Sequence, residues 1–325
     1  MEEYHIRKYS PADYSAWNMF ITKAKNATFL FHRDYMDYHS NRFTDYSIIL
    51  IKNNKFIAVL PANIVDQQLH SHQGLTYGGL VVAEKTKLSD VIVMFRIMLQ
   101  YLSDQGIYRL HLKMIPEIYH KRPSGELHYA LFLADAKLVR RDSLSVIDRS
   151  LPYIPSKSRR KCALRGLNHG LTVKEESNLE AFWKEILIPN MSKKHDVQPV
   201  HSIDEILRLH QLFPDNIRHF NVYHQKKLVA GTTVFVTDKV IHPQYISGNS
   251  DKNELGSLDF LYNHLISEVF TDKHYFDFGI SNESNGRKLN SSLIFWKESF
   301  GASTVVQDFY TVETSSFVNL ENVLI

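Results

Sequence analysis

The order of apolar and polar positions is similar in the two halves of the chain. In the first half, two apolar runs flank the turn residues Asn53 and Asn54, which is typical of a β-hairpin. Strand-like runs and segments with apolar spacing near 3.6 residues follow. This first copy comprises predicted strands at 46–52, 55–64, 75–82, 108–114 and 139–148, and predicted helices at 88–103 and 129–136.

The second half repeats this order with few identical residues. Its hairpin turns at Gln225 and Lys226, and Ser257 is placed to cap the helix that follows the third strand. This copy comprises predicted strands at 219–224, 228–236, 240–247, 274–279 and 304–310, and predicted helices at 258–270 and 289–299. Further helices are predicted at 12–25 and 32–40 before the first copy, and at 155–168, 178–187 and 203–213 before the second.

Hairpin, strand, helix, strand, helix and strand in succession predict a mixed α/β fold with mixed sheets. The pattern differs from a doubly wound nucleotide-binding fold, and the glycine-rich phosphate motifs of such folds do not occur in the sequence. Pro152 and Pro155 interrupt the pattern between the copies. We therefore expect two domains, at residues 1–150 and 151–325.

Composition and charge narrow the class of protein. The 325 residues carry a net charge of +3, too small to indicate nucleic acid binding by itself. Cys162 is the single cysteine, so no internal disulfide framework is possible. The 17 histidines include no H-E-x-x-H motif, and we expect no metal. The sequence has no apolar run of about 20 residues and no signal-like apolar segment near Met1, so we expect a cytoplasmic protein without a transmembrane segment.

Two segments near the C-terminus carry a resemblance to a known family. They are Tyr275-Phe-Asp-Phe-Gly-Ile-Ser-Asn-Glu-Ser-Asn-Gly-Arg-Lys-Leu-Asn290 and Phe295-Trp-Lys-Glu-Ser-Phe-Gly301. They resemble the C-terminal signature of the FemAB-like branch of the GNAT acyltransferases. Residues 31–39, 42–46 and 76–79 resemble that family's N-terminal helix and a loop at its substrate cleft. The resemblance implies two tandem GNAT-like acyl-CoA N-acyltransferase units, the first degenerate and on the acceptor side, the second for donor binding and catalysis.

The same resemblance implies a function. We expect an N-acyltransferase that moves an acyl group from acyl-CoA to an amine, in the synthesis of cell-envelope or surface-polysaccharide precursors. The acceptor would be a small-molecule or a lipid- or nucleotide-linked amine. One alternative is an aminoacyl-tRNA-dependent peptidyl transferase of peptidoglycan bridge formation, which the modest charge disfavours. Another is an inactive GNAT scaffold that only binds a ligand or a partner.

The candidate donor site follows the third strand of the second copy. GNAT units hold the donor's pyrophosphate at a helix N-terminus after a Q/R-x-x-G-x-G/A loop. Here the matching residues are 253–258, where Asn253 replaces Gln or Arg and Leu258 replaces the last small residue. The alternative is that Gly256 ends an ordinary loop. The candidate donor-binding residues are Ser247, Gly248, Asn249, Asn253, Gly256 and Ser257.

Two residues are candidates for catalysis. Lys297 has apolar neighbours, and a partly desolvated ammonium stabilises an oxyanion or a phosphate; the alternative is a surface lysine that extends past a core helix. Asp277 lies in an aromatic strand and is a candidate base if burial raises its pKa; the alternative is a partner for Arg287 or Lys288.

The remaining candidates concern the acceptor and a basic segment. The substrate-binding candidates are Arg33, Tyr38, Tyr77, Tyr245, Glu283, Asn285 and Arg287. Residues 157–165 contain five positive charges, which suit a phosphate-rich ligand or a solvated helix face.

Overall fold

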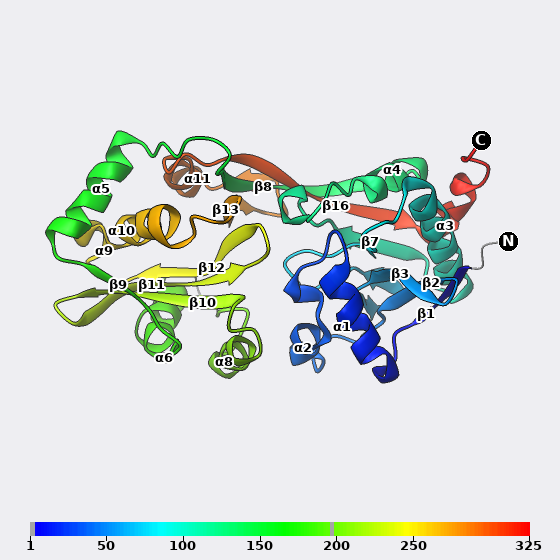
Figure 1. The fold of residues 1–325 in the computed structure, drawn as a ribbon, viewed down its shortest axis with the longest axis horizontal. Helices are drawn as coiled ribbons and strands as arrows, with labels where there is room; N and C mark the ends of the chain where they lie inside the picture. Colours follow the sequence, from blue (N-terminus) through cyan, green and yellow to red (C-terminus); the bar gives the residue numbers. More distant parts are fainter. Residues whose placement is uncertain (1–3, 196–197) are drawn as a thin grey trace. The chain divides into compact units, whose positions relative to one another are not determined.

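The computed structural model describes residues 4–195 and 198–325, which form two compact units (Figure 1). Unit 1 contains the chain up to Asp142 together with Ser284–Arg287 and Val306–Ile325. Unit 2 contains Ser143–Glu283 and Lys288–Val305. Both units mix strands and helices, which confirms the predicted α/β class.

Unit 1 contains two runs of paired strands, ordered β1-β2-β3-β6 and β4-β5-β7-β16-β8. Its strands are β1 (Tyr4–Lys8), β2 (Ile48–Lys52), β3 (Lys55–Leu60), β4 (Asn63–Val65), β5 (Gln68–His70), β6 (Val81–Val82), β7 (Arg109–Lys113), the start of β8 (Lys137–Asp148) and most of β16 (Ser303–Glu313). Its helices are α1 (Tyr14–Lys23), α2 (Arg33–Met36), α3 (Leu88–Asp104) and α4 (Glu126–Leu133).

The core of unit 1 forms around α3, as its apolar spacing predicts. Val91, Phe95, Met98 and Leu102 are each 0% exposed and follow one another at intervals of three or four residues. They pack in one cluster with inward residues of β2, β3 and β7. The hairpin between β2 and β3 turns at Asn53 and Asn54, whose φ angles of 49° and 60° are those of a type I′ turn.

Unit 2 contains one run of strands, ordered β8-β13-β12-β11-β10-β9, and a two-stranded hairpin. Its strands are the end of β8, β9 (Thr172–Glu175), β10 (Ile217–His224), β11 (Lys227–Val236), β12 (Val240–Gly248), β13 (Tyr275–Ile280), β14 (Asn282–Glu283) and β15 (Lys288–Leu289). Its helices are α5 (Lys157–Asn168), α6 (Glu180–Phe182), α7 (Ile188–His195), α8 (Ile203–Leu212), α9 (Lys252–Leu255), α10 (Ser257–His264) and α11 (Ser291–Glu298).

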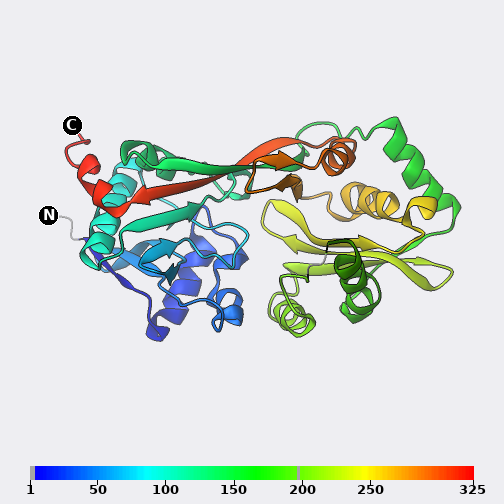
Figure 2. The ribbon, with the colours of Figure 1, turned by 180° about the vertical axis from the view of Figure 1, so that it is seen from behind.

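Helices cover both faces of the unit 2 sheet, with α10 on one face and α6 and α8 on the other (Figures 1 and 2). The aromatic core lies on the α10 side. Tyr262 of α10 is fully buried, and its ring centroid lies 5.5 Å from that of Phe278 and 6.0 Å from that of Phe276. α10 therefore fixes the position of β13, which bears the family-like sequence.

The two final strands differ from the sequence-based expectation, in which each copy ends on its own last strand. Residues 144–148 of β8 pair with β13 of unit 2, and residues 309–313 of β16 pair with β7 of unit 1. The last strand of each sequence copy therefore contributes to the sheet of the other. The compact units consequently differ from the contiguous segments 1–150 and 151–325, because Val306–Ile325 belongs with unit 1.

Two local predictions were also wrong. The strand expected at 75–82 is limited to Val81–Val82, because the chain before it loops closely over β7, where the Gly78 N–H donates to the Lys113 carbonyl at 2.7 Å. Ser257 does not cap α10 but is its first residue, and Gly256 with φ 67° precedes it. Among the helices in the described part of the chain, none is long and apolar enough to cross a membrane.

Candidate active site in unit 2

Strands β12 and β13 of unit 2 diverge after a short parallel contact. Their register covers only Val240 with Tyr275 and Ile241 with Phe276, although β12 continues to Gly248. β13 instead pairs with β8, and that register shifts between Asp277 and Ile280. Among the described residues, no strand pairs with the second half of β12 on that side. Backbone groups of such a splayed strand are able to pair with an extended ligand.

A polar cluster lies where the two strands separate. The Asp277 carboxylate is 1% exposed and accepts a hydrogen bond from the Gly279 N–H at 2.7 Å. The Lys297 ammonium donates to the backbone carbonyls of Gly279 at 2.9 Å and Ile280 at 2.6 Å. The irregular end of β13 is thus held from two sides, by its own aspartate and by a lysine from α11.

Burial of Lys297 follows from the way α11 begins. The Asn290 side chain accepts a hydrogen bond from the Leu293 N–H at 3.0 Å and caps the helix. In this register Lys297 faces inward and is 3% exposed, whereas Phe295 is 69% exposed. Desolvation lowers the Lys297 pKa to about 8, although nearby Asp277 favours the charged form. The surface-lysine interpretation is therefore wrong.

His242 belongs to this cluster, and the sequence analysis did not select it. Its Nδ1 lies 3.0 Å from the Asp277 carbonyl oxygen and 3.5 Å from the Asp277 carboxylate. Both atoms are acceptors, so Nδ1 carries the proton in a neutral ring and Nε2 is left as an acceptor. A polar histidine within the otherwise apolar run Val240-Ile-His-Pro of β12 is a sequence signal for this residue.

The polar groups at the end of β12 and in the turn after it form hydrogen bonds with Asn190 and with one another. The Asn190 side chain donates to the Ser247 hydroxyl and the Gly248 carbonyl, each at 2.8 Å. Asn249 exchanges hydrogen bonds with Asp251, its side chain accepting from the Asp251 N–H at 3.0 Å. Asn253 is exposed on α9, and its carbonyl accepts from Arg165 of α5 at 2.8 Å.

The start of α10 lies beneath α5. A Cβ atom at Gly256 would lie 2.5 Å from the carbonyl oxygen of Cys162, so the glycine allows two helices to approach closely. Ser257 is 0% exposed, and its hydroxyl has no hydrogen-bond partner among the described residues. Helix α5 therefore covers Gly256 and Ser257, the two residues at the start of the helix that were predicted to hold a pyrophosphate.

The substrate-binding candidates of the C-terminal half are dispersed. Tyr245 is buried on the α8 face, where its hydroxyl lies 2.5 Å from His201 Nδ1. Glu283 is exposed in β14 and accepts from Asn290 at 3.3 Å. Asn285 and Arg287 are exposed at the tip of the β14–β15 hairpin, in the segment that belongs to unit 1.

The candidates in the N-terminal half belong to unit 1. Arg33 is 3% exposed and is held by Asp37 at 2.5 Å and Asp45 at 3.2 Å. The Tyr77 hydroxyl is buried and donates to Thr28 at 3.0 Å. Tyr38 is half-exposed and stacks on His39 with ring centroids 4.2 Å apart. Arg33 and Tyr77 thus stabilise the unit from inside.

Comparison with known proteins identifies the fold. No family model and no curated protein matches the sequence. Among solved structures, FemX aligns over 98% of this chain and 99% of its own, with a TM-score of 0.68 and 8% identity. The chain has the FemAB-like tandem GNAT fold. L-PGS from Bacillus licheniformis aligns over 93% of this chain and 91% of its own, with a TM-score of 0.58 and 12% identity.

A third solved structure with this fold is a conserved protein of unknown function from Bacteroides thetaiotaomicron. It aligns over 96% of this chain and 99% of its own, with a TM-score of 0.57 and 11% identity. The resemblance inferred from residues 275–301 is therefore confirmed at the level of the fold.

Proposed function

We propose that the chain is an N-acyltransferase that moves an acyl group to an amine acceptor of cell-envelope or surface-polysaccharide precursor synthesis. The observation that carries the proposal is the divergence of β12 and β13 directly beside a buried polar cluster. The opening offers backbone groups to an extended acyl donor, and the cluster supplies a proton acceptor and an oriented carboxylate. The FemAB-like fold supports this class of reaction.

The proposed reaction requires positioning and one proton acceptor. The neutral amine attacks the acyl carbonyl carbon, and the bond from that carbon to the donor's sulfur or oxygen then breaks. The amine proton passes to Nε2 of His242, and the leaving thiolate or alkoxide takes up a proton. Asp277 orients His242 through its carbonyl and carboxylate. Lys297 acts as a positioning residue, because it holds the Gly279 and Ile280 carbonyls.

Substitution of His242 tests the proposed base. His242→Gln should lower kcat for acyl transfer about 100-fold or more, because general-base catalysis typically contributes that much. The matched control is His274→Gln, at an exposed position directly before β13, which should keep normal turnover. Both variants should melt near the wild-type temperature. Normal turnover in folded His242→Gln would remove His242 from the mechanism.

The identity of the acyl donor is a separate question. The resemblance favours acyl-CoA, but two observations support an aminoacyl-tRNA as the second candidate. First, α5 covers Gly256 and Ser257, where a CoA pyrophosphate would bind. Second, α5 exposes Lys157, Arg160 and Lys161 to solvent, and such cations bind a phosphate backbone.

A thermal-shift comparison separates the two donors. A ligand that binds only the folded state raises the melting temperature. Stabilisation by millimolar CoA or acyl-CoA, and none by aminoacyl-tRNA, supports the thioester donor. Stabilisation by aminoacyl-tRNA that is lost in Arg160→Gln/Lys161→Gln supports the second candidate. If neither donor shifts the melting temperature and neither supports transfer, the acyltransferase proposal fails and an inactive scaffold remains.

A further inference from the structure

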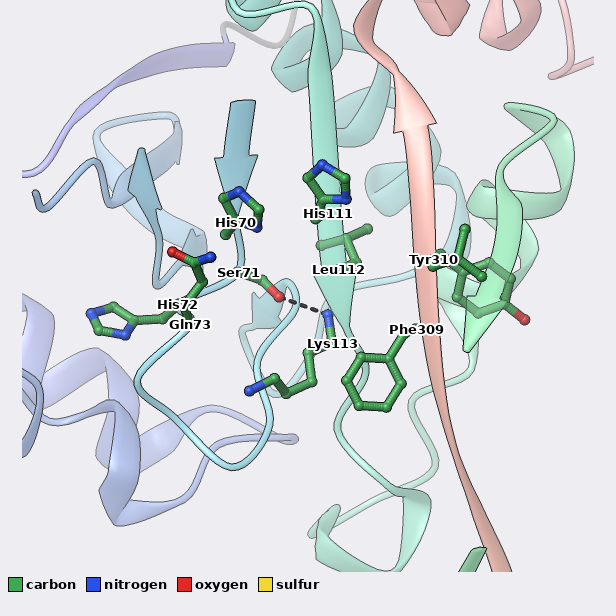
Figure 3. A pocket seen from close by; sticks show the side chains of 10 residues that line it. His70, Ser71, His72, Gln73, His111, Leu112, Lys113, Phe309 and Tyr310 are labelled. Carbon is green, nitrogen blue, oxygen red and sulfur yellow. Dashed lines mark hydrogen bonds between the residues drawn. The ribbon is translucent and has the colours of Figure 1, made fainter. Parts of the chain in front are cut away.

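A cavity of about 140 Å³ lies in unit 1 and takes no part in the proposed reaction (Figure 3). Three neighbouring strands supply its principal side chains. His70 of β5 is the register partner of His111 of β7, and Lys113 of β7 is the register partner of Phe309 of β16. Residues 111 and 113 lie two apart on one strand, so their side chains share one face of the sheet.

The histidines of this cavity are neutral at pH 7. The rings of His70 and His111 stack with centroids 4.5 Å apart. Burial lowers the pKa of His111 to about 4, and that of His72, which also lines the cavity, to about 3. These rings therefore present flat, uncharged surfaces, and His111 Nε2 already lies 2.7 Å from the Gln68 side-chain oxygen.

Lys113 brings the positive charge. Its Nζ donates to the Leu75 carbonyl at 2.5 Å. Within the described part of the chain, no carboxylate lies within ion-pair distance of this ammonium. Asp142 is the carboxylate that favours its charged form, but Arg140 binds Asp142 through two nitrogens at 2.6–3.1 Å. Burial lowers the Lys113 pKa to about 8, so the ammonium still predominates at pH 7. A half-buried cation without a counterion attracts an anion and repels a metal ion.

His72 lines the edge of the cavity and packs against other rings, with its ring centroid 4.9 Å from that of His39. It is 4% exposed, and its Nδ1 has no hydrogen-bond partner in residues 4–195 and 198–325. Its φ of 59° lies in the left-handed region, which is uncommon for a residue other than glycine. Buried polar atoms are normally paired. The His72 ring points away from Lys113 and Phe309 (Figure 3), so this unpaired nitrogen does not bear on the ligand of the cavity.

We propose that this cavity binds the anionic group, a carboxylate or a phosphate, of a small ligand whose flat or apolar part lies against Phe309 and the His70–His111 pair. Lys113 supplies the charge-assisted hydrogen bond, which is stronger than a neutral one. Phe309 supplies an apolar wall beside Lys113 (Figure 3). The proposal concerns unit 1 alone and does not rest on the transfer reaction.

Four probes distinguish the contribution of the anionic charge to binding from that of the aromatic ring. They are phenyl phosphate, benzoate, inorganic phosphate and the uncharged benzamide, titrated at pH 7 and followed by NMR line broadening and by melting temperature. Phenyl phosphate or benzoate should bind at least about tenfold more tightly than benzamide, since a hydrogen bond to a charged group contributes that much. Tighter binding of phenyl phosphate would identify the anionic group as a phosphate, and tighter binding of benzoate would identify it as a carboxylate.

Matched variants assign the binding to the cavity. Lys113→Met should reduce the affinity for the tighter anion about tenfold, whereas Lys85→Met, at an exposed position of the same unit, should not change it. Lys113→Gln, which can still donate to the Leu75 carbonyl, replaces the methionine variant if that one does not fold. Phe309→Leu should weaken phenyl phosphate or benzoate but not inorganic phosphate. Benzamide binding as tightly as benzoate and phenyl phosphate, full anion affinity without Lys113, or no binding of any probe at 20 mM would each overturn the proposal.

Discussion

Lys297 places a positive charge inside unit 2, where two backbone carbonyls accept its hydrogen bonds. Its apolar neighbours in the sequence predicted this desolvation, but not its acceptors, because those depend on a bulge in β13 that local sequence does not encode. Asp277 was similarly predicted to be buried. The sequence could not show that it faces His242, which lies 35 positions away on another strand. The sequence thus predicted the environment of these two residues but not their hydrogen-bond partners.

The buried ammonium should make stability depend on pH in a defined direction. The Lys297 pKa is about 8 in the folded state and 10.5 ordinarily, so the unfolded state binds more protons between these values. The free energy of unfolding of the wild type should therefore rise by about 3 kcal/mol relative to Lys297→Met between pH 8 and pH 10.5. Urea melts at several pH values measure this difference.

A lysine outside the core provides the control for that measurement. Lys288 is exposed on β15, so the difference between wild type and Lys288→Met should stay flat across the same pH range. A flat difference for Lys297→Met as well would mean that its ammonium is not desolvated in solution.

At the scale of elements, the contact between α5 and the start of α10 determines how accessible the candidate donor loop is to a phosphate. The sequence predicted both helices, and in the structure Ser156 caps α5 by accepting from the Arg159 N–H at 3.2 Å. The sequence could not show that they pack against each other through Gly166 and Gly256. A glycine where two helices cross cannot be distinguished, from sequence alone, from a glycine in a loop. A Cβ atom at Gly166 would lie 2.5 Å from Phe260. The glycine that suggested phosphate binding is thus explained by helix packing.

Two glycine substitutions separate backbone strain from crowding. Gly256 and Gly170 have φ angles of 67° and 69°, so alanine at either position costs about 1–2 kcal/mol in conformation. Only Gly256 has an atom in the way, the Cys162 carbonyl, whereas nothing lies within 4 Å of a Cβ at Gly170. We expect Gly256→Ala to lower the free energy of unfolding by at least about 1 kcal/mol more than Gly170→Ala.

Chemical denaturation of the two variants measures this difference. Equal losses would show that α5 does not press on Gly256 in solution. The loop would then be open to a phosphate, and the acyl-CoA donor would gain support.

At the scale of the whole chain, the course of β8 and β16 was not predictable from the sequence. Both segments were predicted as strands, but their alternation of apolar residues does not specify which sheet they join. The core of unit 1 includes Val312, at 2% exposed, and Leu320, at 3% exposed, which are remote in sequence from the rest of that core. Such long-range pairings depend on the complete packing of each unit.

Fragments of the chain test this dependence. Residues 1–150 alone should not melt cooperatively, because they lack the partner strand of β7 and part of their core. The same residues joined by a flexible linker to residues 303–325 should show a cooperative transition. Circular dichroism melts compare the two. Equal cooperative transitions would show that unit 1 does not need β16.

The position of β16 near the end of the chain also determines when unit 1 can complete its fold during translation. β7 leaves the ribosome long before β16 has been translated, and at the usual rate of about 5–20 residues per second the interval is on the order of 10–40 s. Unit 2 contains mostly intervening sequence, so it is nearly complete when the missing strand emerges. Unit 1 is therefore the first unit to be synthesised and the last to complete its fold. During that interval the unpaired edge of β7 is the part of the nascent chain most in need of a chaperone.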